Sequence, residues 1–243
     1  MTARRGDESV VFGVLLVCQA NVCRSPSAVA LFEHRVASTT LAGSLAFGSA
    51  GVRPEPAAGW CRAARSYVRR RGCEPSPDHL PRRLDVDFIE SADLVLAMSR
   101  RERAAIVRLV PTAAPRTFTL VEAAALADAV VDQLRRLDSA ETTESSLVIS
   151  EPPHTSSTTG RLQWLVGEMN AARGLVELST SDGRRRWSRG EPEIPNIDIE
   201  DAHASRRASH RRTLSRLSEQ VGRFSEAVQQ ASEHRPRRAD WQA

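Results

Sequence analysis

Near its N-terminus the chain has an apolar run that gives way abruptly to polar residues. Positions Val10 to Val17 are almost continuously apolar and rich in valine, which is typical of a strand buried on both faces of a parallel sheet. After a short polar stretch, Pro26 stands where the first turn of a helix tolerates proline, and apolar residues continue through Val36. This pattern predicts a central strand, a tight loop and a helix.

The same alternation continues along the chain. Apolar runs predict further strands at 45–50, 93–98 and 116–119, and helical spacing predicts helices at about 57–71 (ending at Gly72), 101–109 and 162–173. Beyond Ala204, apolar residues recur at spacings of three and four and predict a last helix that packs on the core, with Leu214, Leu217, Val221, Phe224 and Val228 on one face. Strands that alternate with helices predict an α/β fold with three layers, in which helices flank a small, about four-stranded parallel sheet.

Two stretches lack such a pattern. Residues 138–160 are rich in Ser, Thr, Glu and Pro and are expected to form a mobile insertion, because they cannot bury enough apolar surface to order themselves. Residues 179–195 are loop-like. The charged ends, 1–9 and 232–243, are expected to be flexible, which leaves 10–231 as a single domain.

Composition narrows the class of protein. Hydrophobic residues make up 41% and charged residues 26% of the 243 positions, as in ordinary globular proteins. The net charge of +4 comes from arginine alone, since the chain contains no lysine. The arginines are spread rather than clustered with aromatic residues, and no helix-turn-helix, zinc or RNP signature is present, so no nucleic-acid partner is expected.

Cysteine content and hydropathy predict the compartment. The apolar run that ends at Cys18 is about half the length that a membrane span needs, so neither a membrane segment nor a signal peptide is expected. Four cysteines are too few for a disulfide framework and lack paired metal-ligand spacing. We therefore expect a cytoplasmic monomer without metal or cofactor.

The polar loop after the first strand carries the candidate chemistry. Cys18 and Arg24 are separated by five residues, which lets the backbone curl into a nest of N–H groups at the positive end of the following helix. A tetrahedral anion fits such a nest, and the same field favours the thiolate of Cys18, a nucleophile. Arg24 offers a planar fork of donors to phosphate oxygens, and Ser25 offers its hydroxyl to the thiolate. The predicted phosphate-binding residues between and beside them are Gln19, Ala20, Asn21, Val22, Cys23 and Ser25.

These residues read VCQANVCRSP and resemble the loop C-x-G-N-x-C-R-S-P of the low-molecular-weight protein tyrosine phosphatases, with Ala20 in place of glycine. The segments 48–52, 78–84, 92–102 and 115–122 also resemble that family. The similarity covers about residues 10–125 and, more weakly, 160–230. It implies a phosphatase that cleaves phosphate monoesters, in phosphotyrosine proteins or small aryl phosphates, through a phosphocysteine on Cys18. It also implies that Asn21 and Ser49 support the loop by hydrogen bonding.

The resemblance further implies an aspartate that protonates the leaving oxygen. The family supplies it in a D-P segment before the last helix, which corresponds here to Asp198-Ile-Glu-Asp-Ala-His203. Glu200 and Ala202 replace the two prolines of that segment, and His203 replaces the aromatic residue that follows. We predict Asp201 as the general acid, with Asp198 as the competitor. The alternative is that these acidic residues only cap the helix that follows.

Several interpretations stay open. Cys23 either forms a protective disulfide with Cys18 or is a small buried residue at the start of the helix, whereas Cys61 and Cys73 are expected only to pack. The altered Asp segment allows a phosphate-binding reader with weak or no catalysis. A redox enzyme resembling arsenate reductases needs further cysteines beyond the third predicted strand, and Met98 and its neighbours offer none.

Overall fold

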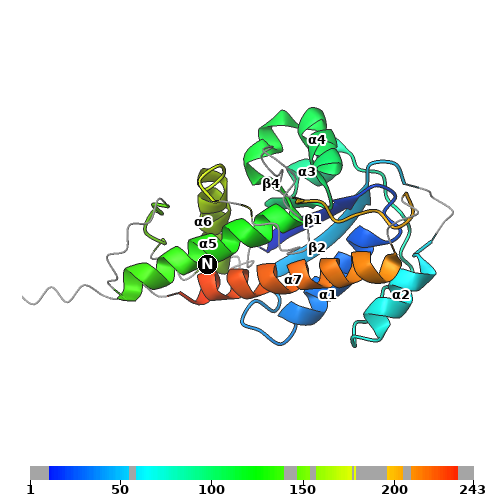
Figure 1. Cartoon of the computed structure of the whole chain (residues 1–243), viewed down its shortest axis with the longest axis horizontal. Coiled ribbons are helices and arrows are strands. Elements are labelled where there is room, and N and C mark those ends of the chain that lie inside the picture. The colour runs from blue at the N-terminus through cyan, green and yellow to red at the C-terminus, as the bar shows by residue number, and fades with distance from the viewer. Residues whose placement is uncertain are drawn as a thin grey trace, which may run out of the picture.

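A computed structural model describes residues 11–54, 59–139, 147–153, 157–176, 178, 196–204 and 209–234. In these ranges four strands alternate with helices (Figure 1). The strands are β1 (Phe12–Cys18), β2 (Leu45–Gly51), β3 (Leu94–Ala97) and β4 (Thr117–Thr119). The helices are α1 (Arg24–Val36), α2 (Arg62–Arg69), α3 (Val86–Glu90), α4 (Arg100–Leu109), α5 (Leu120–Ser139), α6 (Thr158–Ala171) and α7 (His210–Glu233), with a 3₁₀ turn, η1, at Pro111–Arg116.

The strands form one parallel sheet in the order β2-β1-β3-β4. The apolar run at the start of the chain is therefore the central strand, as its lack of alternation predicts, because neighbours pair with it on both sides and helices cover both of its faces. The α/β class, the four-stranded parallel sheet and the loop that follows the first strand are confirmed. All four strands point the same way, so their carboxyl ends meet at one edge of the sheet.

Successive side chains of β1 enter two different cores. Val14 and Leu16 are buried in a cluster with residues of α1, α5, α6 and α7, whereas Leu15 and Val17 are buried in a second cluster with residues of α3 and α4. Figure 1 shows the same division, with α1 and α7 on one side of the sheet and α3 and α4 on the other. A strand with both faces covered must be apolar at every position.

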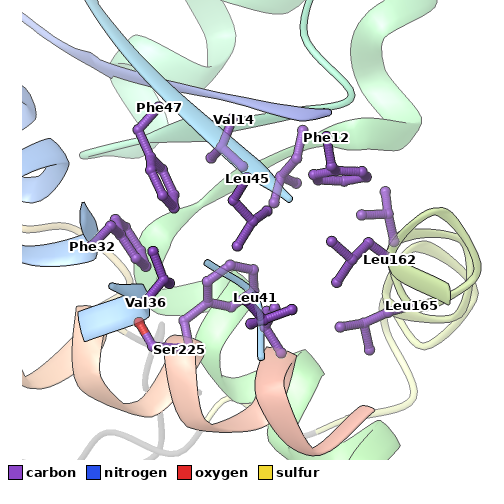
Figure 2. A pocket seen from close by; sticks show the side chains of 14 residues that line it. Phe12, Val14, Phe32, Val36, Leu41, Leu45, Phe47, Leu162, Leu165 and Ser225 are labelled. Atoms are coloured by element: carbon purple, nitrogen blue, oxygen red, sulfur yellow. The ribbon is translucent and has the colours of Figure 1, made fainter. Parts of the chain in front are cut away.

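A cavity in the larger core lies between the sheet, α1, α6 and α7 (Figure 2). Phe32 stacks on Phe47 with ring centroids 5.3 Å apart, and Phe224 meets Phe32 edge-on at 6.1 Å. Apart from Ser225, the lining side chains are apolar. Because it holds no ionisable group, this cavity offers no chemistry of its own.

The structure corrects several predicted boundaries. The helix expected at 57–71 begins only at Arg62 and ends at Arg69, followed by Gly72 with a φ of 77°; residues 57 and 58 lie outside the described part. The helix α6 starts four residues earlier than predicted. The long helix α5 has no counterpart among the predicted elements, although its buried residues, among them Ala123, Ala127 and Val130, have helical spacing.

The expected insertion is described only in part. Residues 140–146 and 154–156 lie outside the described ranges, as do 179–195 and the ends 1–10 and 235–243. Between them, Leu147 and Ile149 are buried in the larger core, so this stretch contributes packing. The last helix is confirmed as α7, and the predicted apolar face is buried. Across the described residues, no helix combines the length and apolar content needed to cross a bilayer.

Candidate active site

The loop between β1 and α1 curls around the sulfur of Cys18. The Sγ atom lies 3.3 Å from the backbone N–H of Asn21 and 3.0 Å from Oγ of Ser25. Asn21 has a φ of 58°, a left-handed conformation that asparagine tolerates better than most residues. The turn directs the Asn21 N–H toward the sulfur, and Cys18, Asn21, Arg24 and Ser25 are all buried.

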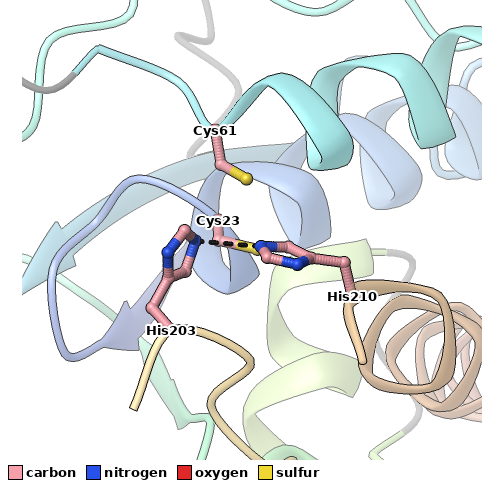
Figure 3. A group of neighbouring side chains, drawn as sticks. All are labelled: Cys23, Cys61, His203 and His210. Atoms are coloured by element: carbon pink, nitrogen blue, oxygen red, sulfur yellow. Dashed lines mark hydrogen bonds between the residues drawn. The ribbon is translucent and has the colours of Figure 1, made fainter. Parts of the chain in front are cut away.

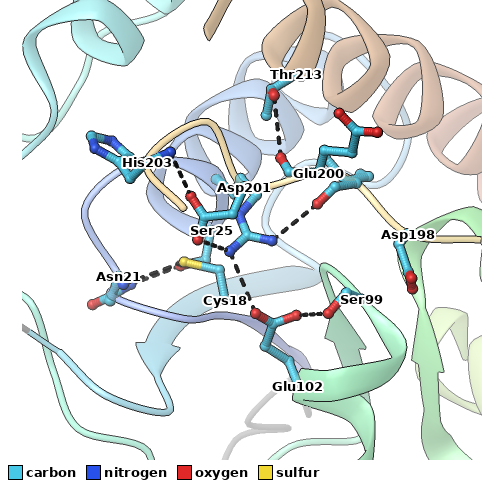
Figure 4. A network of polar contacts seen from close by, with 12 residues as sticks. Cys18, Asn21, Ser25, Ser99, Glu102, Asp198, Glu200, Asp201, His203 and Thr213 are labelled. Carbon is cyan, nitrogen blue, oxygen red and sulfur yellow. Dashed lines mark hydrogen bonds and ion pairs between the residues drawn. The ribbon is translucent and has the colours of Figure 1, made fainter. Parts of the chain in front are cut away.

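The Asn21 side chain ties the loop to its surroundings. Its Nδ2 donates to Oγ of Ser25 at 2.9 Å (Figure 4). The same Nδ2 donates to Oγ of Ser49 at 2.9 Å, and its Oδ1 accepts from the backbone N–H of Arg82 at 2.9 Å. Its backbone oxygen lies 2.7 Å from Nε2 of His79. Asn21 therefore joins the loop to β2 and to the segment before α3.

The other loop residues contribute through their backbones. The carbonyl oxygens of Cys18, Gln19 and Val22 accept from the N–H groups of Val52, Arg53 and Cys61 at 3.0, 2.8 and 2.6 Å respectively. The side chain of Val22 is buried, whereas Gln19 and Ala20 are half-buried. These bonds bind both sides of the loop to neighbouring segments.

Arg24 is 3% exposed and is surrounded by acceptors. Its Nη1 donates to the Ile199 carbonyl oxygen at 3.0 Å, and its Nη2 lies 3.4 Å from Oε1 of Glu102 and 2.5 Å from Oδ2 of Asp201. Burial lowers the pKa of Arg24, but the negative charges of Cys18, Glu102 and Asp201 outweigh it and raise the pKa above its ordinary value. The guanidinium thus stays charged inside the protein.

Glu102 is a site residue that the sequence reasoning missed. It is buried, it accepts a hydrogen bond from Oγ of Ser99, and it faces Arg24. The spacing Ser-x-x-Glu at the start of α4 is a helix-capping signal, which could have singled out this glutamate. Its contact with Arg24 spans 78 positions of the chain and depends on how α4 packs beside β1.

The two candidate acids lie in different places (Figure 4). Asp201 contacts Arg24, and its Oδ1 accepts from the backbone N–H of His203 at 2.9 Å. Asp198 instead accepts from the backbone N–H of Arg100 at 2.7 Å and pairs with its guanidinium at 2.9 Å, at the start of α4. The structure therefore brings Asp201 to the loop and leaves Asp198 outside it.

The segment that carries Asp201, residues 198–203, is held at three points despite its missing prolines. The Ile199 N–H donates to the Met98 carbonyl at 2.8 Å, the Thr213 hydroxyl donates to the Glu200 carbonyl at 3.2 Å, and Arg24 donates to Ile199. We call this segment the Asp loop. Its position rests on backbone bonds that its sequence does not reveal.

The four cysteines are free thiols with different surroundings. Cys73 is buried in the core, as expected. Cys61, which precedes α2, was expected only to pack, but its thiol hydrogen-bonds with that of Cys23. That bond, helped by hydrogen bonds with the Ala64 N–H, with His203 and with the Ala63 N–H, lowers the pKa of Cys61 to about 4. The same bond, together with burial, raises the pKa of Cys23.

Comparisons with known proteins agree with this geometry. The family described as "Low molecular weight phosphotyrosine protein phosphatase" matches residues 13–132. The low molecular weight protein-tyrosine-phosphatase Ptp of Acinetobacter johnsonii is 31% identical over 107 residues, which are 44% of this chain and 70% of that protein. A protein-arginine-phosphatase of Geobacillus stearothermophilus is 34% identical over 109 residues, 45% and 69% of the respective chains.

Solved structures are similar at lower identity. The match to the YwlE arginine phosphatase from Geobacillus stearothermophilus covers 66% of this chain and 91% of the YwlE chain, with 24% identity and a TM-score of 0.40. The low molecular weight protein tyrosine phosphatase from T. tengcongensis covers 65% and 95%, with 23% identity and a TM-score of 0.42. Since two curated relatives are more than 30% identical and matched over 70% and 69% of their lengths, the chain belongs to the low molecular weight phosphotyrosine protein phosphatase family of cysteine-dependent hydrolases.

Proposed function

We propose that this protein hydrolyses phosphotyrosine in proteins through a phosphocysteine intermediate on Cys18. The observation that carries the proposal is the convergence of three groups on one loop. The Cys18 sulfur contacts a loop N–H, the loop arginine Arg24 is buried, and the carboxylate of Asp201 reaches that arginine at 2.5 Å. A nucleophile, a phosphate clamp and an acid are the groups that this hydrolysis requires.

In the first step the thiolate of Cys18 attacks phosphorus. The S–P bond forms as the P–O bond to the substrate breaks, and protonated Asp201 gives its proton to the departing oxygen. Ser25 donates its hydroxyl hydrogen to the thiolate, from which its Oγ lies 3.0 Å away. The loop N–H groups and Arg24 bind the equatorial oxygens, whose charge grows in the transition state.

In the second step water cleaves the phosphocysteine. The Asp201 carboxylate accepts a proton from the water as its oxygen attacks phosphorus, the S–P bond breaks, and Cys18 leaves as a thiolate. Inorganic phosphate then departs. One carboxylate therefore serves as acid and then as base.

Arg24 links phosphate binding to the placement of Asp201. Its Nη2 now contacts Asp201, and a phosphate in the loop offers an oxygen to the same donor. Exchange of these partners releases the carboxylate toward the leaving oxygen. Glu102 and the Ile199 carbonyl hold the guanidinium plane during the exchange, since they remain acceptors throughout.

The substrate class rests on the surroundings of the loop. The rings of Trp60 and His79 lie 5.5 Å apart, and His79 contacts the backbone oxygen of Asn21. Aromatic surface beside the loop favours an aryl phosphate. Phosphoarginine is the second candidate, favoured because a relative at 34% identity is a protein-arginine-phosphatase. Comparing kcat/KM on matched phosphotyrosine and phosphoarginine peptides decides between them, and a preference for the arginine peptide refutes the first proposal.

The chemistry is tested with p-nitrophenyl phosphate and aryl phosphates of poorer leaving groups. Cys18→Ser abolishes turnover. Asp201→Ala slows turnover by about 10²- to 10⁴-fold with poor leaving groups and by less with p-nitrophenolate, whereas the matched control Asp198→Ala retains the leaving-group dependence of the wild type. The acid assignment is wrong if the two aspartate variants exchange these behaviours. If the wild type binds phosphate but does not hydrolyse these substrates, the protein is instead a non-catalytic phosphate-binding reader.

A further inference from the structure

Four potential metal ligands meet beside the phosphate loop, outside the groups that the proposed chemistry uses. They come from separate segments: Cys23 ends the phosphate loop, Cys61 precedes α2, His203 follows Asp201 by two residues and His210 begins α7. Figure 3 shows their side chains converging on one place. The sequence predicts no metal site, because these residues are too far apart along the chain to form a ligand spacing.

Their geometry approaches that of a tetrahedral site. Their ligand atoms all lie within 4.8 Å of one another. A tetrahedral Zn²⁺ with its usual Zn–N and Zn–S lengths sets its ligand atoms roughly 3.3 to 3.8 Å apart. The Nε2 atoms of His203 and His210 are already 3.2 Å apart, with the rings at 90°. Closing the rest of the cluster on an ion needs movements of about 1 Å or less.

The donor set selects the kind of ion. Two thiols and two imidazoles suit Zn²⁺, whereas Ca²⁺ and Mg²⁺ prefer oxygen ligands. Cys23 is 4% exposed, Cys61 and His210 are half-buried and His203 is exposed, so an ion can enter from the His203 side and reach a buried sulfur. The backbone bond from Cys61 N to the Val22 carbonyl, 2.6 Å long, fixes the first two ligands beside each other.

Hydrogen bonds account for some of these contacts. Cys61 hydrogen-bonds with Cys23 and with His203, whose ring hydrogen-bonds in turn with that of His210. Such pairwise bonds do not by themselves require all four ligand atoms to lie within 4.8 Å of one another and to face one place (Figure 3). A shared ion explains that convergence, because it takes one lone pair from each side chain.

We propose that Cys23, Cys61, His203 and His210 bind one Zn²⁺ in a tetrahedral site. On binding, each thiol becomes a thiolate and releases its proton to solvent, and each imidazole binds as the neutral ring through Nε2. The ion joins the phosphate loop to the Asp loop and to α7. With its sulfur on the metal, Cys23 is not available for a disulfide with Cys18.

Cobalt titration of the reduced, metal-free full chain tests the site, because tetrahedral Co²⁺ bound to thiolates has intense ligand-field and sulfur charge-transfer absorption. We expect both bands to saturate at one equivalent of Co²⁺ and to vanish when Zn²⁺ is added. The readout is optical, so it is independent of whether the protein hydrolyses phosphotyrosine. Absence of these bands in the wild type overturns the proposal.

Variants locate the ligands. Cys61→Ser and His210→Ala each weaken Co²⁺ binding by more than about 100-fold, beyond the effect of losing an outer-shell partner. Cys73→Ser is the matched control and keeps the spectrum, as does Cys18→Ser, which separates this site from metal binding at the nucleophile. Loss of the bands in Cys18→Ser, or their survival in both ligand variants, refutes the assignment. Because the two ligand variants alter different elements, either one decides the test if the other does not fold.

Thermal unfolding gives an independent readout. Added Zn²⁺ raises the Tm of the wild type and of Cys73→Ser, because an ion that binds only the folded chain stabilises it. It leaves the Tm of the ligand variants unchanged. A Zn²⁺-dependent rise of equal size in Cys61→Ser places the ion elsewhere and refutes the site.

Discussion

Gly51, at the end of β2, lies close against the backbone of the phosphate loop. A Cβ atom at this position lies 3.0 Å from the Ala20 carbonyl carbon and from both N and Cβ of Asn21. The Gly51 backbone cannot retreat easily, because its N–H donates to the Arg82 carbonyl at 2.8 Å and its carbonyl accepts from Leu84 N–H at 2.9 Å. The added methyl group of Gly51→Ala therefore displaces the phosphate loop at Ala20 and Asn21.

The size of the effect follows from these distances. A separation of 3.0 Å is about 0.5 Å short of optimal carbon–carbon contact, and overpacking of this kind costs about 1–3 kcal/mol of stability. A displacement of 1 Å in a reacting group can cost about 100-fold in rate. For Gly51→Ala we expect kcat/KM on p-nitrophenyl phosphate to fall by about 10- to 100-fold, with a lower midpoint of urea unfolding.

Gly48→Ala on the same strand is the matched control. Its Cβ meets only Cδ1 of Leu15, at an ordinary 3.9 Å, so activity stays at the wild-type level. Stability rises by about 0.4–1 kcal/mol, because alanine restricts the unfolded chain. If the kcat/KM of Gly51→Ala lies within about twofold of the Gly48→Ala value, the close approach of β2 does not shape the loop and the reasoning fails.

Three further substitutions probe the site and the core. Glu102→Gln removes a buried charge opposite Arg24, and we expect it to lower the free energy of unfolding by about 1–3 kcal/mol and to reduce kcat; a variant as stable and active as the wild type contradicts the orienting role. Ser49→Ala removes a hydrogen-bond acceptor of the Asn21 side chain, and we expect kcat/KM to fall by about 5- to 30-fold in the p-nitrophenyl phosphate assay. An unchanged kcat/KM shows that the loop keeps its shape without this hydrogen bond. Leu16→Ala opens a cavity in the central strand and costs about 2–5 kcal/mol in urea unfolding, whereas the half-exposed Leu109→Ala stays within about 0.5 kcal/mol; equal losses count against the assigned core.

Local patterns in the sequence determined the architecture and the loop. The apolar strand, the C-x5-R spacing and Ser-Pro after it are contained within residues 10 to 26, so short-range sterics and hydrophobicity suffice to predict strand, loop and helix. The same holds for α7, whose apolar residues have one helical period. The helix α5 had an equally local signal, since its buried residues have helical spacing, but it was not predicted.

Only the tertiary structure decided which distant groups meet. Asp198 and Asp201 are equally acidic and three residues apart, and what separates them is that the Asp loop pairs with Met98 at the end of β3 while Asp198 caps α4. Glu102 reaches Arg24, and Cys23 meets Cys61, His203 and His210, only because the parallel strands end at one edge and bring these segments together. Contacts between segments carry no periodicity along the chain, so they become visible only when the chain is packed.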